Sequence, residues 1–136
     1  MSEPGCIFCQ IAEGRAPSTK VREDATTLAF MNIAPATRGH VLVIPKRHSR
    51  NIFDIPQSDI RDVAAASQEV ARWQRERLGC AGVSVFQSNE RAGWQVVFHY
   101  HVHVVPRYEG DPLVVPWHAE MKDPVELEPV AAQLRG

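Results

Sequence analysis

The chain of 136 residues is long enough for one compact domain and too short for two of ordinary size. Its 15 Lys and Arg residues balance 16 Asp and Glu residues without a long block of either sign, which disfavours a nucleic-acid binder with a basic face. The start, MSEPGCIFCQ, lacks the pattern of a signal peptide, and no apolar run approaches membrane-spanning length. We therefore expect a cytoplasmic protein without nucleic-acid or membrane partners.

The first half of the chain has the pattern of one short helix, three strands and one long helix. Residues 6–12 are predicted as a short helix, closed by the turn that follows. Short strands are expected at 21–23, 26–31 and 40–44. After Pro56, apolar residues recur at helical spacing and predict a long helix, for which Gly79 supplies a stop.

The second half is predicted to contain two further strands, at 83–87 and 96–105. From about residue 111 the chain is rich in proline, so we expect an irregular or extended tail. Strands joined by short turns, with one long helix between them, indicate an α+β domain with an antiparallel sheet that occupies residues 1–136.

Three of the six histidines stand at alternate positions in HYHVHVVPR, residues 99–107. Residues two apart share one face of a strand, so His99, His101 and His103 are expected to point the same way. The opposite face, which we expect to pack on the long helix, carries Phe98, Tyr100, Val102 and Val104. Three buried imidazoles each need a polar partner, so core packing alone explains them poorly.

Metal binding and phosphoryl chemistry are the two roles that this pattern favours. Two histidines two apart can share a zinc ion, but the outer pair would lie about 13 Å apart in a regular strand, far beyond zinc–nitrogen bonds of about 2 Å. A neutral imidazole is a good nucleophile near pH 7, and a neighbouring histidine and Gln95 can donate to phosphate oxygens. The three rings are therefore expected to divide at least two tasks.

The stretch GWQVVFHYHVHVVPR resembles the signature of the histidine triad (HIT) family. CIFCQIAEGRAPSTKV, LAFMNIAPATRGHVLVIPKRH and Trp117 also resemble the small bacterial branch related to nucleoside phosphoramidases, and together these segments cover most of residues 5–117. The resemblance implies a homodimeric α+β, HIT-like fold, with an antiparallel sheet of about five strands, one long helix and one short helix. It also implies a purine nucleotide substrate joined to an amine, or a related ester or anhydride.

The resemblance assigns roles to individual residues. His101 is expected to be the nucleophile and to form a transient nucleotidyl-histidine, while His103 contacts the α-phosphate and Gln95 hydrogen-bonds the phosphate or leaving group. Trp117 is expected either to reach the active site of the other subunit or to cap a core edge. The apolar base slot would consist of Ile7, Phe8, Ile11, Phe30 and Ile33, which simple core packing would also explain.

Three positions depart from the family pattern. Asn32 stands where an acidic residue often holds the ribose hydroxyls, so the contact would lack a charge. Val96 replaces a common Ser or Thr, and Trp94 replaces a common glycine on the leaving-group side. The upstream asparagine of the family aligns with Ser88 or with Asn89, so both are candidate nucleotide-binding residues.

The Cys6-x-x-Cys9 pair is compatible with buried thiols, a redox pair or a metal site. The resemblance favours a metal, because a subset of bacterial members binds structural zinc through two such cysteines and two histidines. The expected ligands are Cys6, Cys9, His48 and His99, a closed tetrahedral set. His99 would then serve the zinc ion, which leaves His101 and His103 for phosphate.

These expectations describe a hydrolase or transferase that acts at the α-phosphate of nucleoside phosphoramidates or related nucleotide conjugates. Within the same chemistry, the alternative is a diadenosine polyphosphate hydrolase or phosphorylase. From a different class, the alternatives are a zinc-stabilised nucleotide-binding interaction module and a purely structural zinc domain. The structural domain would leave Gln95, His101 and His103 without an evident purpose.

Overall fold

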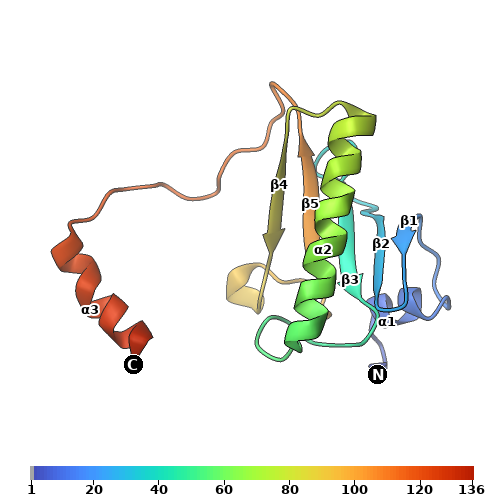
Figure 1. Ribbon diagram of the computed structural model, residues 1–136, viewed down its shortest axis with the longest axis horizontal. Coiled ribbons are helices and arrows are strands. Elements are labelled where there is room, and N and C mark those ends of the chain that lie inside the picture. Colours follow the sequence, from blue (N-terminus) through green and yellow to red (C-terminus); the bar gives the residue numbers. More distant parts are fainter. Residues whose placement is uncertain (1) are drawn as a thin grey trace.

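Five strands form one antiparallel sheet in the order β1-β2-β3-β5-β4 (Figure 1). The computed structural model describes residues 2–136. The strands are β1 (Lys20–Glu23), β2 (Thr27–Met31), β3 (Val41–Pro45), β4 (Gly82–Gln87) and β5 (Val102–Arg107). The helices are α1 (Ile7–Ala12), α2 (Gln57–Trp73) and α3 (Pro124–Arg135), with a π-helical turn at Gln74–Leu78 and a 3-10 turn at Arg91–Gly93. The predicted α+β fold is confirmed.

Helix α2 covers one face of the sheet (Figure 1). Its buried residues Val63 and Val70 pack with Val43 of β3 and with Val102 and Val104 of β5. Tyr100 joins this cluster, as the alternation of residues 98–104 predicts. Phe98 was also expected in the cluster, and this prediction is wrong, because its ring lies against the Arg50 guanidinium, 4.3 Å from the ring centre. The helix continues as the π-helical turn until Gly79, which has φ 67° and ends it as predicted.

The other face of the sheet carries helix α1 and a second apolar cluster. Phe8 and Ile11 of α1 pack there with Phe30, Leu42 and Ile44. Cys6 is the N-cap of α1, and its Sγ accepts a hydrogen bond from Cys9 N at 3.3 Å. The first cysteine therefore stabilises the turn that holds the second.

Strand β5 begins later than predicted, at Val102 instead of Val96. The preceding residues instead bond to the end of β3 and to the loop that follows it: His99 Nε2 donates to Pro45 O at 2.8 Å, and Tyr100 N donates to Ser49 O at 2.8 Å. These bonds replace the regular strand ladder. Of the three phased histidines, only His103 lies within the strand, so the expectation of one regular strand face is wrong for His99 and His101.

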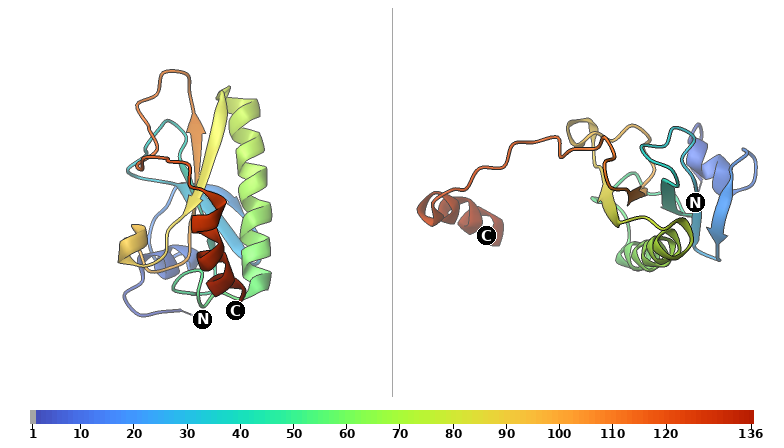
Figure 2. Two further views of the ribbon diagram at one scale, coloured as in Figure 1. Left: turned by 90° about the vertical axis from the view of Figure 1, so that its left-hand side faces the viewer. Right: turned by 90° about the horizontal axis from the view of Figure 1, so that it is seen from above.

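The C-terminal residues from 111 onward form an arm that leaves the body past β4 (Figures 1 and 2). Residues 111–123 are irregular, as predicted, but residues 124–135 form helix α3, which the sequence analysis missed. Asp123 caps this helix by accepting from Val125 N at 2.9 Å, and Pro124 occupies its first turn. An Asp–Pro pair of this kind is a helix-start signal, and it could have revealed α3. The protein thus has a third helix.

Candidate functional site

His101 lies at the centre of the histidine segment with one ring nitrogen committed and the other free. Its Nδ1–H donates to the backbone oxygen of His99 at 2.7 Å. Nε2 therefore carries the lone pair. Within residues 2–136, Gln74 Oε1 is the one buried side-chain nitrogen or oxygen atom without a hydrogen-bond partner. His101 Nε2 is not among such buried atoms, so it reaches the surface, although only 6% of the residue is exposed. Burial lowers the pKa of His101, which keeps the ring neutral at pH 7.

The ring of His101 is held between two others. Phe8 meets it edge-on, with centroids 5.2 Å apart, and the His103 ring lies 5.0 Å away. The His103 ring also stacks on Phe86 of the edge strand β4, at 4.2 Å and 9°. Rings fixed in this way present their free nitrogens in defined directions.

A chain of hydrogen bonds sets the tautomer of His103. Ala36 N donates to Nδ1 of His40 at 3.0 Å, so the proton of that neutral ring is on Nε2. His40 Nε2 then donates to His103 Nδ1 at 3.0 Å, which places the proton of His103 on its own Nε2. Burial, assisted by the nearby His101 and His40, lowers the pKa of His103 to about 4. His103 is therefore a neutral hydrogen-bond donor beside a neutral nucleophile.

His40 was expected only to belong to a strand, and its contact with His103 was missed. The two residues are 63 positions apart, and no spacing in the sequence connects them. The preceding residue, Gly39, has φ 93° and leaves no room for a Cβ beside the Leu78 side chain. The backbone that carries His40 is thus tightly constrained.

Cys6, Cys9, His48 and His99 form a cluster in which the four ligand atoms lie within 4.8 Å of one another. His99 Nδ1 is 3.4 Å from Cys6 Sγ and 3.5 Å from Cys9 Sγ, and His48 Nδ1 is 3.3 Å from Cys9 Sγ. Because the proton of His99 is on Nε2, its Nδ1 lone pair faces the two thiols. These are the four residues that the resemblance to the HIT family selected.

The donor set of this cluster fits a tetrahedral cation. Two sulfur and two imidazole nitrogen atoms are the ligands that zinc prefers, and separations of 3.3–3.5 Å suit metal–ligand bonds of about 2.0–2.3 Å. Burial raises the pKa of the Cys6 thiol. Burial, opposed by the bond to Pro45 O, lowers the pKa of His99 to about 4. If a cation binds, the thiols release their protons, whereas the neutral imidazoles coordinate without losing one.

Gln95 was expected to donate to a phosphate, but its side chain is fully engaged. Its Nε2 donates to the backbone oxygens of Arg50, at 2.7 Å, and Val97, at 3.1 Å. Its Oε1 accepts from Glu90 N at 2.8 Å and from Asn51 Nδ2 at 3.2 Å. Both amide hydrogens are therefore used within the chain, and the contact of Gln95 with phosphate or the leaving group stays a prediction. Gln95 joins the loop after β3 to the loop before the histidines.

The five residues expected to form a base slot divide into two groups. Phe8, Ile11 and Phe30 are buried in the second apolar cluster, whereas Ile7 is half exposed and Ile33 is 99% exposed. The edge of Phe8 that contacts His101 is where this apolar group meets the histidines. Core packing thus accounts for three of the residues, and the other two face solvent.

The remaining residues that were expected to contact the nucleotide differ in their hydrogen-bond partners and in their exposure. Asn32 Oδ1 accepts from Ala34 N at 2.8 Å, which turns its amide nitrogen toward His40, 3.5 Å away. Asn89 Oδ1 accepts from Ile52 N at 2.7 Å, so this side chain braces a loop, and its neighbour Ser88 is buried. Trp117 is exposed and belongs to the irregular part of the arm.

Comparisons with known proteins agree with the geometry. The family model described as HIT domain matches residues 13–110. The adenosine 5'-monophosphoramidase hnt1 of Schizosaccharomyces pombe is 33% identical over 130 residues, which are 95% of this chain and 95% of that protein.

Two solved structures are similar over almost the whole chain. SMU.412c from Streptococcus mutans UA159 has a TM-score of 0.94 at 36% identity and covers 98% of this chain and 85% of that one. An alignment with this coverage includes the C-terminal arm. A zinc-bound histidine triad family protein from Mycobacterium smegmatis has a TM-score of 0.78 at 39% identity and covers 96% of each chain. In residues 2–136, none of the helices has the length and hydropathy that crossing a membrane would require.

Proposed function

The chain belongs to the HIT domain family, and from this membership and the site geometry we propose that it hydrolyses nucleoside phosphoramidates or related nucleotide conjugates at the α-phosphate. The family match supports a nucleotide hydrolase or transferase in general. The monophosphoramidase of S. pombe supports the choice of a phosphorus–nitrogen bond. One observation carries the proposal most directly: His101 Nδ1 is bonded to a backbone oxygen, so Nε2 offers a fixed lone pair at the surface.

The reaction proceeds in two displacements. His101 Nε2 attacks the α-phosphorus, the bond from phosphorus to the leaving nitrogen breaks, and the amine departs with a proton taken from solvent, which the attacking water of the second step gives back. His103 Nε2–H donates to a nonbridging oxygen as negative charge develops there. Water then attacks the nucleotidyl-histidine, which releases the nucleoside monophosphate and restores neutral His101. Because both rings are neutral at pH 7, no proton has to be removed before the attack.

The substrate's base is proposed to lie over the exposed side chains of Ile7 and Ile33, with Phe8 beneath. Asn32 would contact the ribose hydroxyls. Ser88 is the better placed of the two upstream candidates, because the side-chain oxygen of Asn89 is occupied by Ile52 N. An apolar surface beside a few polar groups is the usual composition of a nucleotide-sized site.

We propose that Cys6, Cys9, His48 and His99 hold a structural zinc ion. The ion would supply a tie between α1, the loop after β3 and the histidine segment. His99 would serve this cluster through its ring and serve His101 through its backbone oxygen. Because the cluster needs reduced thiols, and all three cysteines are free, a cytoplasmic location is proposed.

We further propose a homodimer. Strand β4 is an edge of the sheet and exposes Val85 and Phe86, which a second copy would cover by pairing along that edge. The arm passes this same edge, so Trp117 of a partner could approach the site in which His103 stacks on Phe86 (Figure 2).

The decisive experiment uses adenosine 5'-phosphoramidate and rapid acid-free quenching, followed by mass spectrometry of the intact chain and its peptides. We expect release of AMP and an adenylyl group on the peptide that contains His101. An adduct on another residue, or turnover without any adduct in the wild type and in slow variants, would contradict the mechanism. Turnover of a diadenosine polyphosphate with incorporation of phosphate instead of water would indicate the alternative reaction.

A further inference from the structure

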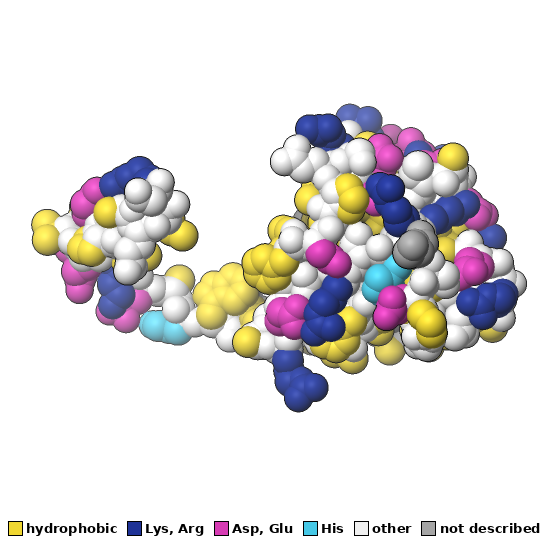
Figure 3. Space-filling view, turned by 90° about the horizontal axis from the view of Figure 1, so that it is seen from below, with side chains coloured by type: hydrophobic (Ala, Val, Ile, Leu, Met, Phe, Trp, Pro, Cys, Tyr) yellow, Lys and Arg dark blue, Asp and Glu magenta, His cyan; other side chains and the backbone are white. Residues whose placement is uncertain are grey.

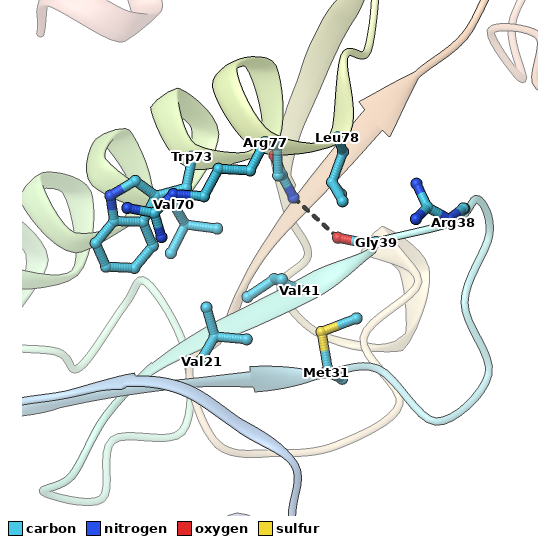
Figure 4. Close-up of a pocket in the computed structure, with 10 residues that line it drawn as sticks. Val21, Met31, Arg38, Gly39, Val41, Val70, Trp73, Arg77 and Leu78 are labelled. Carbon is cyan, nitrogen blue, oxygen red and sulfur yellow. Dashed lines mark hydrogen bonds between the residues drawn. The ribbon is translucent and has the colours of Figure 1, made fainter.

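A cavity on the α2 face has no role in the proposed reaction. It lies between the C-terminal end of α2 and strands β1 to β3, has a volume of about 320 Å³, and we call it the Trp73 pocket (Figure 4). Its apolar lining consists of Val21, Met31, Val41, Val70, Trp73 and Leu78. Exposed apolar concavities of this kind are characteristic of binding surfaces.

One residue that lines the Trp73 pocket, Gln74, has a side-chain oxygen without a hydrogen-bond partner. Gln74 is 3% exposed, and its Nε2 donates to Gly39 O at 3.0 Å, the bond drawn in Figure 4, and to Val104 O at 2.9 Å. Its Oε1 is the buried side-chain oxygen that has no partner within residues 2–136. Buried polar atoms are normally paired, so this oxygen is an exception within a residue that lines the pocket.

The rim of the pocket is positively charged. Arg38 and Arg77 line it and are exposed, and the Arg77 guanidinium lies 4.9 Å from the centre of the Trp73 ring. In the described part of the chain, neither arginine takes part in an ion pair. The occupant that fits this surface is apolar at its centre and acidic at its edges.

Helix α3 has that composition. Leu127, Val130 and Leu134 stand at spacings of three and four and form one apolar stripe. Glu126 flanks the stripe, and Glu128, on the other side, is paired with Arg135 of the same helix. None of the residues of α3 is buried, and apolar side chains are visible on the arm in Figure 3.

The course of the arm points to another copy of the chain. Arg107 donates to both carboxylate oxygens of Asp111, at 2.9 and 2.8 Å, and to Leu113 O at 3.0 Å, which fixes the direction in which the chain leaves β5. The arm then runs beyond β4, away from β1 and the Trp73 pocket (Figures 1 and 2). With two copies related by a two-fold axis at the β4 edge, an arm that runs beyond β4 is directed toward the second copy.

We propose that helix α3 of one protomer docks in the Trp73 pocket of a second copy, with its apolar stripe against Trp73 and its glutamates beside Arg38 and Arg77. This inference rests on the proposed homodimer and is independent of the proposed reaction. Exchange of two identical helices buries both unpartnered apolar surfaces at once.

Photo-cross-linking with isotope mixing tests the proposal on the full chain. Val130 is replaced by p-benzoylphenylalanine, protein labelled with ¹⁵N is allowed to exchange subunits with unlabelled protein, and cross-linked peptides are identified by mass spectrometry. We expect mixed-isotope links from position 130 to the segments 21–41 and 70–78. Links within one isotope only would show that α3 folds back on its own body, and links to other surfaces, or none, would also overturn the proposal. The same probe at the exposed Phe53 is the control and should not reach these segments.

A matched pair of charge insertions gives a second test. Leu134 lies on the apolar stripe and Val125 on the opposite side of α3, and both are more than three-quarters exposed, so neither change disturbs the fold of one protomer. We expect Leu134→Asp to weaken self-association at least about tenfold, since it buries a carboxylate, and Val125→Asp to leave it unchanged, as measured by sedimentation. Equal effects, or no effect of Leu134→Asp, would rule out docking through the stripe. Neither test needs turnover, so a failure of the catalytic proposal would be distinguishable.

Discussion

His99 and His103 lie four residues apart on one segment, yet their surroundings give them opposite chemistry. His99 donates from Nε2 to Pro45 O and turns Nδ1 toward two thiols. His103 accepts at Nδ1 from His40 and turns Nε2–H toward the surface. Between them, His101 is also fixed by a backbone oxygen, but through Nδ1, so its Nε2 is the nitrogen left with the lone pair. The lesson is that the hydrogen bond to one ring nitrogen decides what the other nitrogen can do.

Removal of the His101 ring, which lies between the other two histidines, is expected to have the largest effect. His101→Ala is expected to lower the rate of AMP release by roughly 10³-fold or more, because the nucleophile is lost. The zinc content and melting temperature should stay close to those of the wild type, since His101 is outside the thiol cluster. Kinetics on adenosine 5'-phosphoramidate and elemental analysis measure both. A rate within tenfold of the wild type would exclude His101 as nucleophile.

Opening the thiol cluster should separate its role from that of the phosphate side. Cys9→Ala is expected to abolish stoichiometric zinc binding and to lower the melting temperature by roughly 10 °C, because a metal held only by the folded chain stabilises it. Cys80→Ala is the matched control, since Cys80 is also buried but lies outside the cluster. If a chelator shifts the melting temperature of Cys9→Ala as much as that of the wild type, the ligand assignment is wrong.

Breaking the bond that orients His103 should have an intermediate effect. His40→Leu keeps much of the buried volume but removes the donor to His103 Nδ1, which leaves a buried acceptor unpaired at a cost of about 1–3 kcal/mol. Expressed fully in the transition state, this cost lowers kcat about 5- to 150-fold. Zinc content should be unchanged. If kcat is retained and only the melting temperature falls, His40 has a structural role alone.

Acidification is expected to have the smallest effect, and it tests the surroundings of His103 through the free energy of unfolding. The pKa of His103 is lowered in the fold from 6.5 to about 4, so the unfolded chain binds more protons between these values. The free energy of unfolding should therefore fall as pH drops from 6.5 to 4, by at most about 3 kcal/mol from this group, and this contribution should not change with pH above 6.5. Denaturant titrations of the wild type and of His103→Asn measure the difference. Parallel pH profiles for the two proteins would contradict the assigned shift.

Much of the fold followed from local patterns. Branched residues at 41–44 predicted β3, and helical spacing after Pro56 predicted α2, because these signals act over a few residues. The boundaries of β5 were missed since side-chain and loop bonds, such as that from His99 Nε2 to Pro45 O, replace its ladder. Helix α3 was not predicted, although Asp123 and Pro124 carry a helix-start signal.

The candidate site was predictable in its residue types and less so in its contacts. Resemblance to the HIT family selected Cys6, Cys9, His48 and His99, which the fold brings within bonding distance of one cation. It did not show that Gln95 is consumed by Arg50 O and Val97 O. A glutamine side chain at such a position can brace a loop or face a substrate, and only its neighbours in space distinguish the two.

The sequence by itself determined the alternation of histidines, the Cys-x-x-Cys turn and the periodicity of the core, since each depends on residues that are close in the chain. Only the tertiary structure decided which nitrogen of each ring carries a proton. Cys6 meets His99 across 93 positions and His40 meets His103 across 63, and these long-range contacts arise from strand pairing and loop closure. A hydrogen bond depends on direction and distance in space, which no local pattern specifies.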